Sequence, residues 1–144
     1  MLRTSLITGL PYEDEAAFEE LCGFLREVEI ERAGVFPFSP EDGTRAALMD
    51  YVDTEEAQRR AELLVDVQSD IIDAYNDSLM GEVREVLCEG FDGQAQMFVG
   101  RSYAESPDID GRIYFTAEVD VQPGTFMQVR LTGTMDGELT GEQV

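Results

Sequence analysis

The sequence contains no lysine, no histidine and no tryptophan. All ten of its basic residues are therefore arginines, and no imidazole is present to ligate a metal or to transfer a proton. No apolar run is long enough to span a bilayer, and Met1-Leu2-Arg3 becomes polar too early for a secretory signal. Because neither a membrane span nor a secretory signal is indicated, we expect a cytoplasmic protein.

Cysteine is also scarce. Cys22 and Cys88 lie far apart and lack the paired spacing of a zinc site or a disulfide framework. One falls in a helical pattern and the other in a strand pattern, so we interpret both as small buried hydrophobes.

Acidic residues dominate the charge. The chain has 31 Asp and Glu against 10 basic residues, a formal net charge of −21, and both halves are acidic. Such a surface repels phosphate backbones and attracts basic partners, so RNA binding is disfavoured. The alternative is a solvated acidic surface that only maintains solubility.

The N-terminal part has a β-α-β pattern. Leu6-Ile7 reads as a buried strand that ends at a turn with Gly9 and Pro11. The continuous apolar run 33–38 predicts a parallel strand covered on both faces. Between them a helix begins near Glu13, and its expected inner stripe is Ala17, Phe18, Leu21, Leu25 and Val28.

After a loop at 39–44, a second and longer helix is predicted. Asp53 is placed to cap it, with Glu56 three residues on, and Gly81 is placed to end it. The residues at helical spacing that we expect on its inner face are Ala57, Ala61, Leu64, Gln68, Ile71, Tyr75 and Leu79.

Beyond Gly81 the apolar period changes to two. Five short strands are separated by Gly, Pro and Asp turns, at 83–89, 96–103, 112–117, 126–132 and 138–141. In the fourth strand, Met127, Val129 and Leu131 are expected to face inward. The predicted fold class is α+β, with residues 1–80 as a partial β-α-β segment plus long helix and 81–144 as a small OB-like β-barrel.

The first part poses a physical difficulty. Two parallel strands and their crossover helix cannot cover one another, because parallel sheets need neighbours at their edges and helices on both faces. We therefore expect a missing N-terminal part of the same protein, and poor solubility or dimerisation of the isolated chain.

Three stretches carry a family resemblance: LITGLPYE from Leu6, GVFPFSPEDGT from Gly34 and GRSYAESPDIDG from Gly100. The first two resemble the last β-α-β part of the radical-SAM, TIM-like barrel of the methylthiotransferases, and the segment from Gly81 is similar to their TRAM domain. The third most resembles the RimO branch, which methylthiolates an aspartate of a small-subunit ribosomal protein. Tyr12 is a departure, since that family usually has glycine there.

The resemblance implies reductive cleavage of S-adenosylmethionine by a four-iron cluster, with a second cluster in sulfur delivery. Both clusters need cysteine thiolates, and the CxxxCxxC motif of the first is absent here. The chain is thus interpreted as the C-terminal portion of such an enzyme. This portion is expected to bind no metal and to be inactive alone. The resemblance also places a loop with Gly9, Pro11 and Glu13 at the cosubstrate.

Each of these site residues has a plainer interpretation. Gly9, Pro11 and Glu13 are also what a strand-to-helix turn would use. Phe36 and Phe38 either line the adenosine end of the site or pack in the core.

The segment with Glu105, Asp108 and Asp110 has three interpretations: a calcium loop, an exposed turn or a contact for a basic protein. The further acidic ligands of a complete calcium loop are lacking. We take the three carboxylates as candidates for docking the basic ribosomal protein substrate.

Two other functions remain open. TRAM domains generally bind RNA, and the aromatic residues Tyr103, Tyr114 and Phe126 are candidates for base stacking. Against this, the barrel carries only four arginines beside twelve acids, namely Arg84, Arg101, Arg112 and Arg130. The third possibility is a stand-alone acidic interaction domain, which would require residues 1–80 to fold alone.

Overall fold

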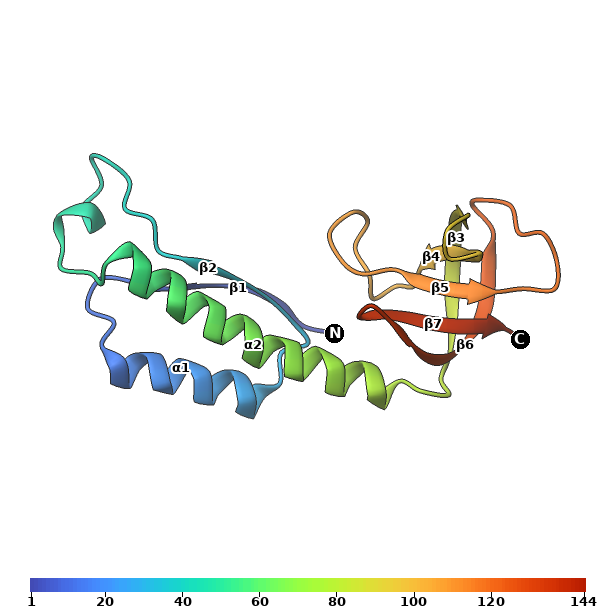
Figure 1. Cartoon of the computed structure of the whole chain (residues 1–144), viewed down its shortest axis with the longest axis horizontal. Coiled ribbons are helices and arrows are strands. Elements are labelled where there is room, and N and C mark those ends of the chain that lie inside the picture. The colour runs from blue at the N-terminus through green and yellow to red at the C-terminus, as the bar shows by residue number, and fades with distance from the viewer. The chain divides into compact units, whose positions relative to one another are not determined.

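A computed structural model describes all residues from 1 to 144, which divide into two compact units, Met1–Ile72 and Asp73–Val144. The first unit contains β1 (Arg3–Thr8), α1 (Glu15–Val28), β2 (Arg32–Pro37), the 3-10 turn η1 (Ala46–Leu48) and most of α2 (Thr54–Ser78) (Figure 1). The second contains β3 (Val83–Asp92), β4 (Met97–Arg101), β5 (Ile113–Thr116), β6 (Phe126–Met135) and β7 (Glu138–Gln143). None of the helices is both long enough and apolar enough to cross a membrane.

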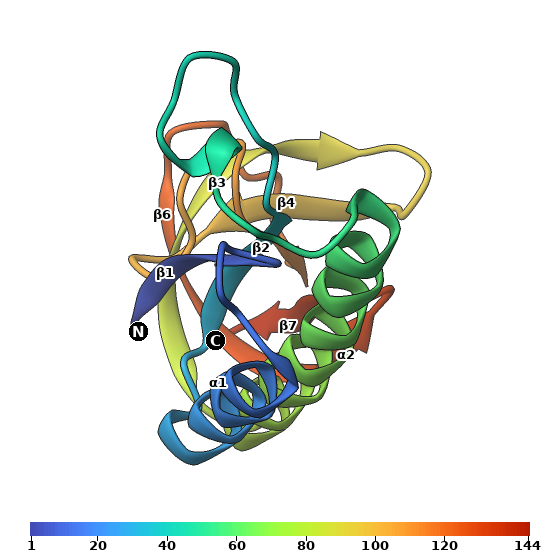
Figure 2. The same cartoon turned by 90° about the vertical axis from the view of Figure 1, so that its left-hand side faces the viewer.

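The first unit is a two-stranded parallel sheet with both helices on the same face. β1 and β2 pair in parallel; α1 lies below them in Figures 1 and 2, and α2 lies to their right in Figure 2. The core between these layers comprises Phe18, Leu25, Leu64 and Val67, with Leu6 and Val35 from the strands packed against it. The predicted β-α-β unit is confirmed.

The prediction that the second strand is covered on both faces is wrong for this chain. Ile7 and Phe36 are paired neighbours on the opposite face of the sheet, and they are 49% and 55% exposed. Strand side chains alternate between faces, so helices on a single side leave every second residue uncovered.

Helix α1 begins at Glu15, close to the predicted start near Glu13, and the Asp14 side chain caps it by accepting from the Ala17 N–H at 2.9 Å. Its core contacts centre on the line through Phe18, Cys22 and Leu25. Ala17 and Val28, expected on the inner stripe, lie at its margin and are exposed.

Helix α2 follows the prediction more closely. The Asp53 carboxylate caps it by accepting from the Glu56 N–H at 2.8 Å. The predicted stripe is buried or half-buried from Ala57 to Leu79. Gly81 then adopts φ +88°, a left-handed conformation that suits the glycine predicted to end the helix.

The second unit is a closed barrel with strand order β3-β4-β5-β7-β6, in which only β5 and β7 are parallel. All five predicted strands are present, and the OB-like barrel is confirmed. Val129 and Leu131 are fully buried and Met127 packs against the core, as the alternation predicted. Cys88 is also fully buried, whereas Cys22 is only half-buried.

Candidate functional site

The turn after β1 is fixed by the carboxylate of Glu13. Its Oε1 accepts hydrogen bonds from the Thr8 hydroxyl at 2.7 Å and the Gly9 N–H at 2.8 Å, and it pairs with Arg60 Nη1 at 2.9 Å. Hydrogen bonds to a carboxylate oxygen are stronger than hydrogen bonds between neutral groups. One oxygen of Glu13 is therefore fully used inside the protein, and the carboxylate defines the shape of the turn.

Arg60 is the cation that ties this turn to α2. Its side chain is only 5% exposed, donates from Nε to Glu56 at 2.8 Å, and places its guanidinium 5.2 Å from the centre of the Phe18 ring. Burial by itself would lower the pKa of Arg60, but the hydrogen bonds to Glu56 and Glu13 raise it above its ordinary value. The turn is thus held by a permanent buried charge.

Gly9 is required by both its conformation and its surroundings. Its φ is +79°, and a Cβ built on it would lie 2.6 Å from the Cβ of Ala57 on α2. Three residues on, Tyr12 adopts φ 66° and donates its N–H to the Asp50 carbonyl at 3.1 Å. A left-handed backbone conformation favours glycine. The conformation of Tyr12 is therefore the one expected for the glycine that the methylthiotransferases usually have at this position.

The two phenylalanines predicted at the site differ in position. The Phe38 N–H donates to the Thr8 carbonyl at 2.8 Å, and its ring meets Tyr51 edge-on at a centroid distance of 5.4 Å. Phe36 lies on the uncovered face of the sheet, so the core-packing interpretation is wrong for it. Pro11 is half-buried in the turn.

A shallow hollow of about 230 Å³ opens beside the turn, lined by Tyr12, Glu13, Asp14, Asp50, Tyr51 and Val52. The lining combines three carboxylates with two aromatic rings and has no cation. This composition suits a ligand that carries positive charge. The predicted residues Gly9, Pro11 and Glu13 shape the turn beside it, and Phe38 supports the Tyr51 wall.

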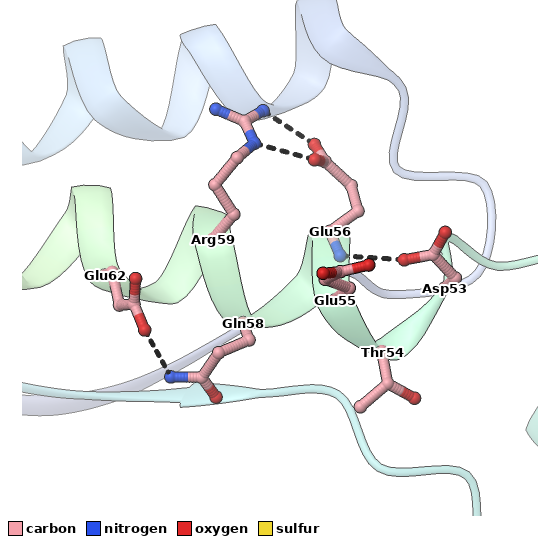
Figure 3. A pocket seen from close by; sticks show the side chains of 7 residues that line it. All are labelled: Asp53, Thr54, Glu55, Glu56, Gln58, Arg59 and Glu62. Carbon is pink, nitrogen blue, oxygen red and sulfur yellow. Dashed lines mark hydrogen bonds and ion pairs between the residues drawn. The ribbon is translucent and has the colours of Figure 1, made fainter.

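A larger hollow of about 880 Å³ lies along the first turns of α2, lined by Asp53, Thr54, Glu55, Glu56, Gln58, Arg59 and Glu62 (Figure 3). Its polar groups mostly bind one another. Arg59 donates two hydrogen bonds of 2.7 and 2.8 Å to the Glu56 carboxylate, and Gln58 donates to Glu62 at 3.0 Å. Hydrogen bonds from Arg59 and Arg60 lower the pKa of Glu56 to about 2. These side chains stabilise the helix and converge on no common point.

The acidic segment of the barrel lies in the loop between β4 and β5. Glu105 is 6% exposed, and its Oε2 accepts from the Ser102 N–H at 2.8 Å and the Ser102 hydroxyl at 2.6 Å. The Asp110 carboxylate accepts from the Ser106 N–H at 2.7 Å, whereas Asp108 is exposed. Of the three predicted docking carboxylates, only Asp108 lies fully on the surface.

Two of the four arginines of the barrel are paired with carboxylates of the same unit, whereas Arg112 and Arg130 are exposed. Arg84 is 8% exposed and pairs with Glu82 at 3.2 Å, and Arg101 pairs with Glu89 at 2.8 Å. Among the aromatic candidates, Tyr103 and Phe126 are 84% and 62% exposed, and Tyr114 is half-buried.

The chain's own side chains do not fit an iron-sulfur cluster. Cys22 is on α1 in one unit and Cys88 is on β3 in the other, and no three His, Cys, Asp or Glu side chains form a group that could hold a metal. Burial raises the pKa of both thiols, which opposes the thiolate form that iron requires.

Sequence reasoning missed Arg60, although its position gave a signal. Residue 60 lies three after Ala57 and four before Leu64, and it therefore falls on the buried face of α2. A charged residue on that face predicts a buried partner. The partner itself, Glu13, follows only from the tertiary structure.

The barrel of the second unit is of the TRAM type, because residues 80–144 match the TRAM domain family. Over nearly its whole length, the chain is similar to proteins named ribosomal protein uS12 methylthiotransferase RimO. It is 44% identical to the one from Desulforudis audaxviator over 133 residues, which are 92% of this chain. It is 40% identical to the one from Clostridium botulinum strain Okra and 38% identical to the one from Acetivibrio thermocellus, over 97% and 100% of the chain.

The resemblance to the RimO branch is therefore confirmed: the chain is similar to these proteins over nearly its whole length, and its residues 80–144 match the TRAM domain. It spans 29 to 32% of the length of these three relatives.

Proposed function

We propose that this chain is the C-terminal part of a ribosomal-protein methylthiotransferase, in which the barrel docks the basic protein substrate. The observation that carries this proposal is the identity of 38 to 44% to RimO proteins over at least 92% of the chain. Because the chain covers about a third or less of those relatives, the reaction, the substrate and the partners of the whole enzyme are inferred from them. Such a substrate would place the reaction in the cytoplasm.

In that enzyme, iron-sulfur clusters would supply the reductive cleavage of S-adenosylmethionine. Their ligands would lie in the missing N-terminal part, since Cys22 and Cys88 do not fit a cluster. Reconstitution of this chain with iron and sulfide should therefore give no four-iron absorption spectrum. A stable cluster bound by these 144 residues would contradict the proposal.

We assign the cosubstrate-facing role to Gly9, Pro11, Glu13, Phe36 and Phe38. S-adenosylmethionine carries a sulfonium and an ammonium group, and the hollow beside the turn is lined by carboxylates and aromatic rings. Glu13 would act by fixing the turn, because its Oε1 is occupied by internal donors.

Docking of the substrate follows from charge. The barrel carries four arginines against twelve acids over residues 81–144, and two of those arginines are paired internally. A negative surface attracts a basic ribosomal protein and repels RNA. Within the acidic loop, Asp108 would face the partner, while Glu105 and Asp110 would hold the loop in shape.

The test measures the binding of this chain to purified ribosomal protein uS12. Fluorescence anisotropy reports the affinity at a series of salt concentrations. We expect binding that weakens as salt screens the charges. Affinity that is unchanged at molar salt, or tighter binding to an RNA oligonucleotide than to uS12, would contradict docking by charge.

RNA binding is the second candidate function, and the exposure of Tyr103 and Phe126 is the observation in its favour. The same measurement decides between RNA binding and docking of uS12. RNA binding requires cationic side chains, and the barrel surface has few of them. A stand-alone acidic interaction domain, the third candidate, would bind uS12 no better than other basic proteins.

A further inference from the structure

The loop between β4 and β5, Ser102–Arg112, is held in one conformation by its own side chains. In its first half the Ser102 hydroxyl donates to Glu105 at 2.6 Å and accepts from the Ala104 N–H at 3.2 Å. All three residues are buried. These contacts close a small internal network, so this half of the loop needs no partner to become ordered.

The second half is fixed in the same way and is also tied to β7. Asp110 accepts from the Ser106 N–H at 2.7 Å, and the Arg112 N–H donates to the carboxylate of Glu138. That carboxylate packs directly against Gly111, so a Cβ at this position would displace the end of the Glu138 side chain. Loop geometry is therefore set before any ligand arrives.

The loop exposes two large apolar side chains to solvent. Tyr103 is 84% exposed and Ile109 is 76% exposed, and these two are the most exposed large hydrophobic side chains of the barrel. The guanidinium of Arg84 lies 5.6 Å from the centre of the Tyr103 ring and supports one face of it. Rigid, exposed aromatic and aliphatic side chains bind partners at a low cost in conformational entropy.

The charge of the loop determines the kind of partner. Residues 102–111 contain three acids and no basic residue, and Asp108 is exposed next to Ile109. This arrangement repels phosphate, which argues against RNA and anionic membranes. It also argues against a second copy of this chain, whose net charge is −21.

We propose that Tyr103, Asp108 and Ile109 form a preformed contact surface for a basic polypeptide segment that also carries apolar side chains. Asp108 pairs with a lysine or arginine of the partner, while Ile109 and the free face of Tyr103 bury its apolar groups. This inference rests on the proposed docking of a ribosomal protein, and it deepens that proposal by naming the surface and its mixed chemistry.

The experiment compares surface variants of the whole chain with matched controls elsewhere on the barrel. Asp108→Asn is matched by Asp136→Asn, because both aspartates are exposed and have left-handed φ values of 60° and 52°. Tyr103→Ala is matched by Phe126→Ala, another exposed aromatic. Binding is measured to purified uS12 and to a synthetic peptide of alternating arginine and leucine.

We expect Tyr103→Ala, Ile109→Ala and Asp108→Asn each to weaken binding of uS12 at least 5-fold, about the effect of a 1 kcal/mol loss. The Asp136 and Phe126 controls should stay within 2-fold of the unsubstituted chain. All five substitutions are at exposed positions, and circular dichroism checks that the barrel remains folded.

The two proposals fail in different ways. If the chain binds uS12 but the three loop variants bind as tightly as the controls, the proposed surface is overturned and the docking function stands. If uS12 does not bind while the arginine-leucine peptide does so in a loop-dependent manner, the surface stands and its assignment to a ribosomal protein is overturned. If neither probe binds, both proposals are overturned.

Discussion

The guanidinium of Arg60 and the carboxylate of Glu13 are 47 positions apart in the chain and meet at 2.9 Å, with side chains only 5% and 10% exposed. The same Glu13 oxygen holds the backbone of Gly9. One ion pair therefore joins the second turn of the long helix α2 to the turn at the carboxyl end of β1, where we place the cosubstrate-facing residues.

Replacing Arg60 with alanine should destabilise the first unit by about 3 kcal/mol, because the Glu13 carboxylate would be left buried without its partner. Urea unfolding of the whole chain, followed by circular dichroism, measures the change. Arg59→Ala is the control, since Arg59 also binds Glu56 but is 53% exposed. Equal effects of the two substitutions would show that the buried pair has no special role.

Gly9→Ala should cost about 3 kcal/mol, of which about 1 comes from the left-handed backbone and the rest from the collision with Ala57. Gly43 has nearly the same φ, +80°, but nothing within 4 Å of its added Cβ. Gly43→Ala should therefore cost only about 1 kcal/mol. The two free energies of unfolding separate crowding from backbone strain, and similar values would contradict the close packing of the turn on α2.

Acid should weaken the first unit through Glu56. Hydrogen bonds from Arg59 and Arg60 lower its folded pKa from 4.5 to about 2, so the folded state holds this carboxylate ionised more strongly than the unfolded chain does. The contribution is fully present above pH 4.5 and is lost as the pH falls towards 2. The measurable quantity is the difference in unfolding midpoint between the unsubstituted chain and Glu56→Gln, which should shrink over that pH range. A difference that is constant with pH would refute the assignment.

Position 12 should favour glycine over alanine. Tyr12 is 72% exposed and has φ 66°, so its side chain contributes little packing while its backbone is strained. Left-handed backbone costs a non-glycine residue about 1 to 2 kcal/mol, and the flexibility of glycine offsets roughly half of that gain. We expect Tyr12→Gly to be about 0.5 to 1 kcal/mol more stable than Tyr12→Ala in thermal unfolding. Alanine as the more stable variant would contradict the observed backbone conformation.

The uncovered face and the edges of the β1–β2 sheet should make the isolated chain self-associate. Ile7 and Phe36 form an exposed apolar pair there, and both strands lack a second neighbour. Added salt should promote association by screening the net charge of −21. The double substitution Ile7→Thr and Phe36→Thr should reduce self-association in sedimentation velocity, whereas Leu48→Thr, at the exposed end of the 3-10 turn η1, should not. A chain that is monomeric at every salt and protein concentration would contradict this.

Local patterns in the sequence predicted most of the elements. The change of apolar period at Gly81 separates helix from barrel, and Asp53 caps α2 where its type and spacing predicted. Periodicity succeeds for such features because helices and strands bury one face at a fixed repeat. It failed at the margins, where Ala17 and Val28 belong to the apolar pattern but lie outside the contact with the sheet.

The candidate site depends more on the tertiary structure. Glu105, Asp108 and Asp110 are alike in the sequence, yet the fold buries the first, ties the third to Ser106 and exposes the second. Likewise Glu13 was predicted at the site, but its three donors come from Thr8, Gly9 and the distant Arg60.

The sequence alone determined the acidic charge, the order of helices and strands, the closed barrel and the resemblance to methylthiotransferases, because these follow from composition, local repeats and short motifs. Only the tertiary structure decided which carboxylates serve the protein internally and which face solvent. The reason is that burial and hydrogen bonding depend on neighbours brought from elsewhere in the chain, and no local pattern encodes them.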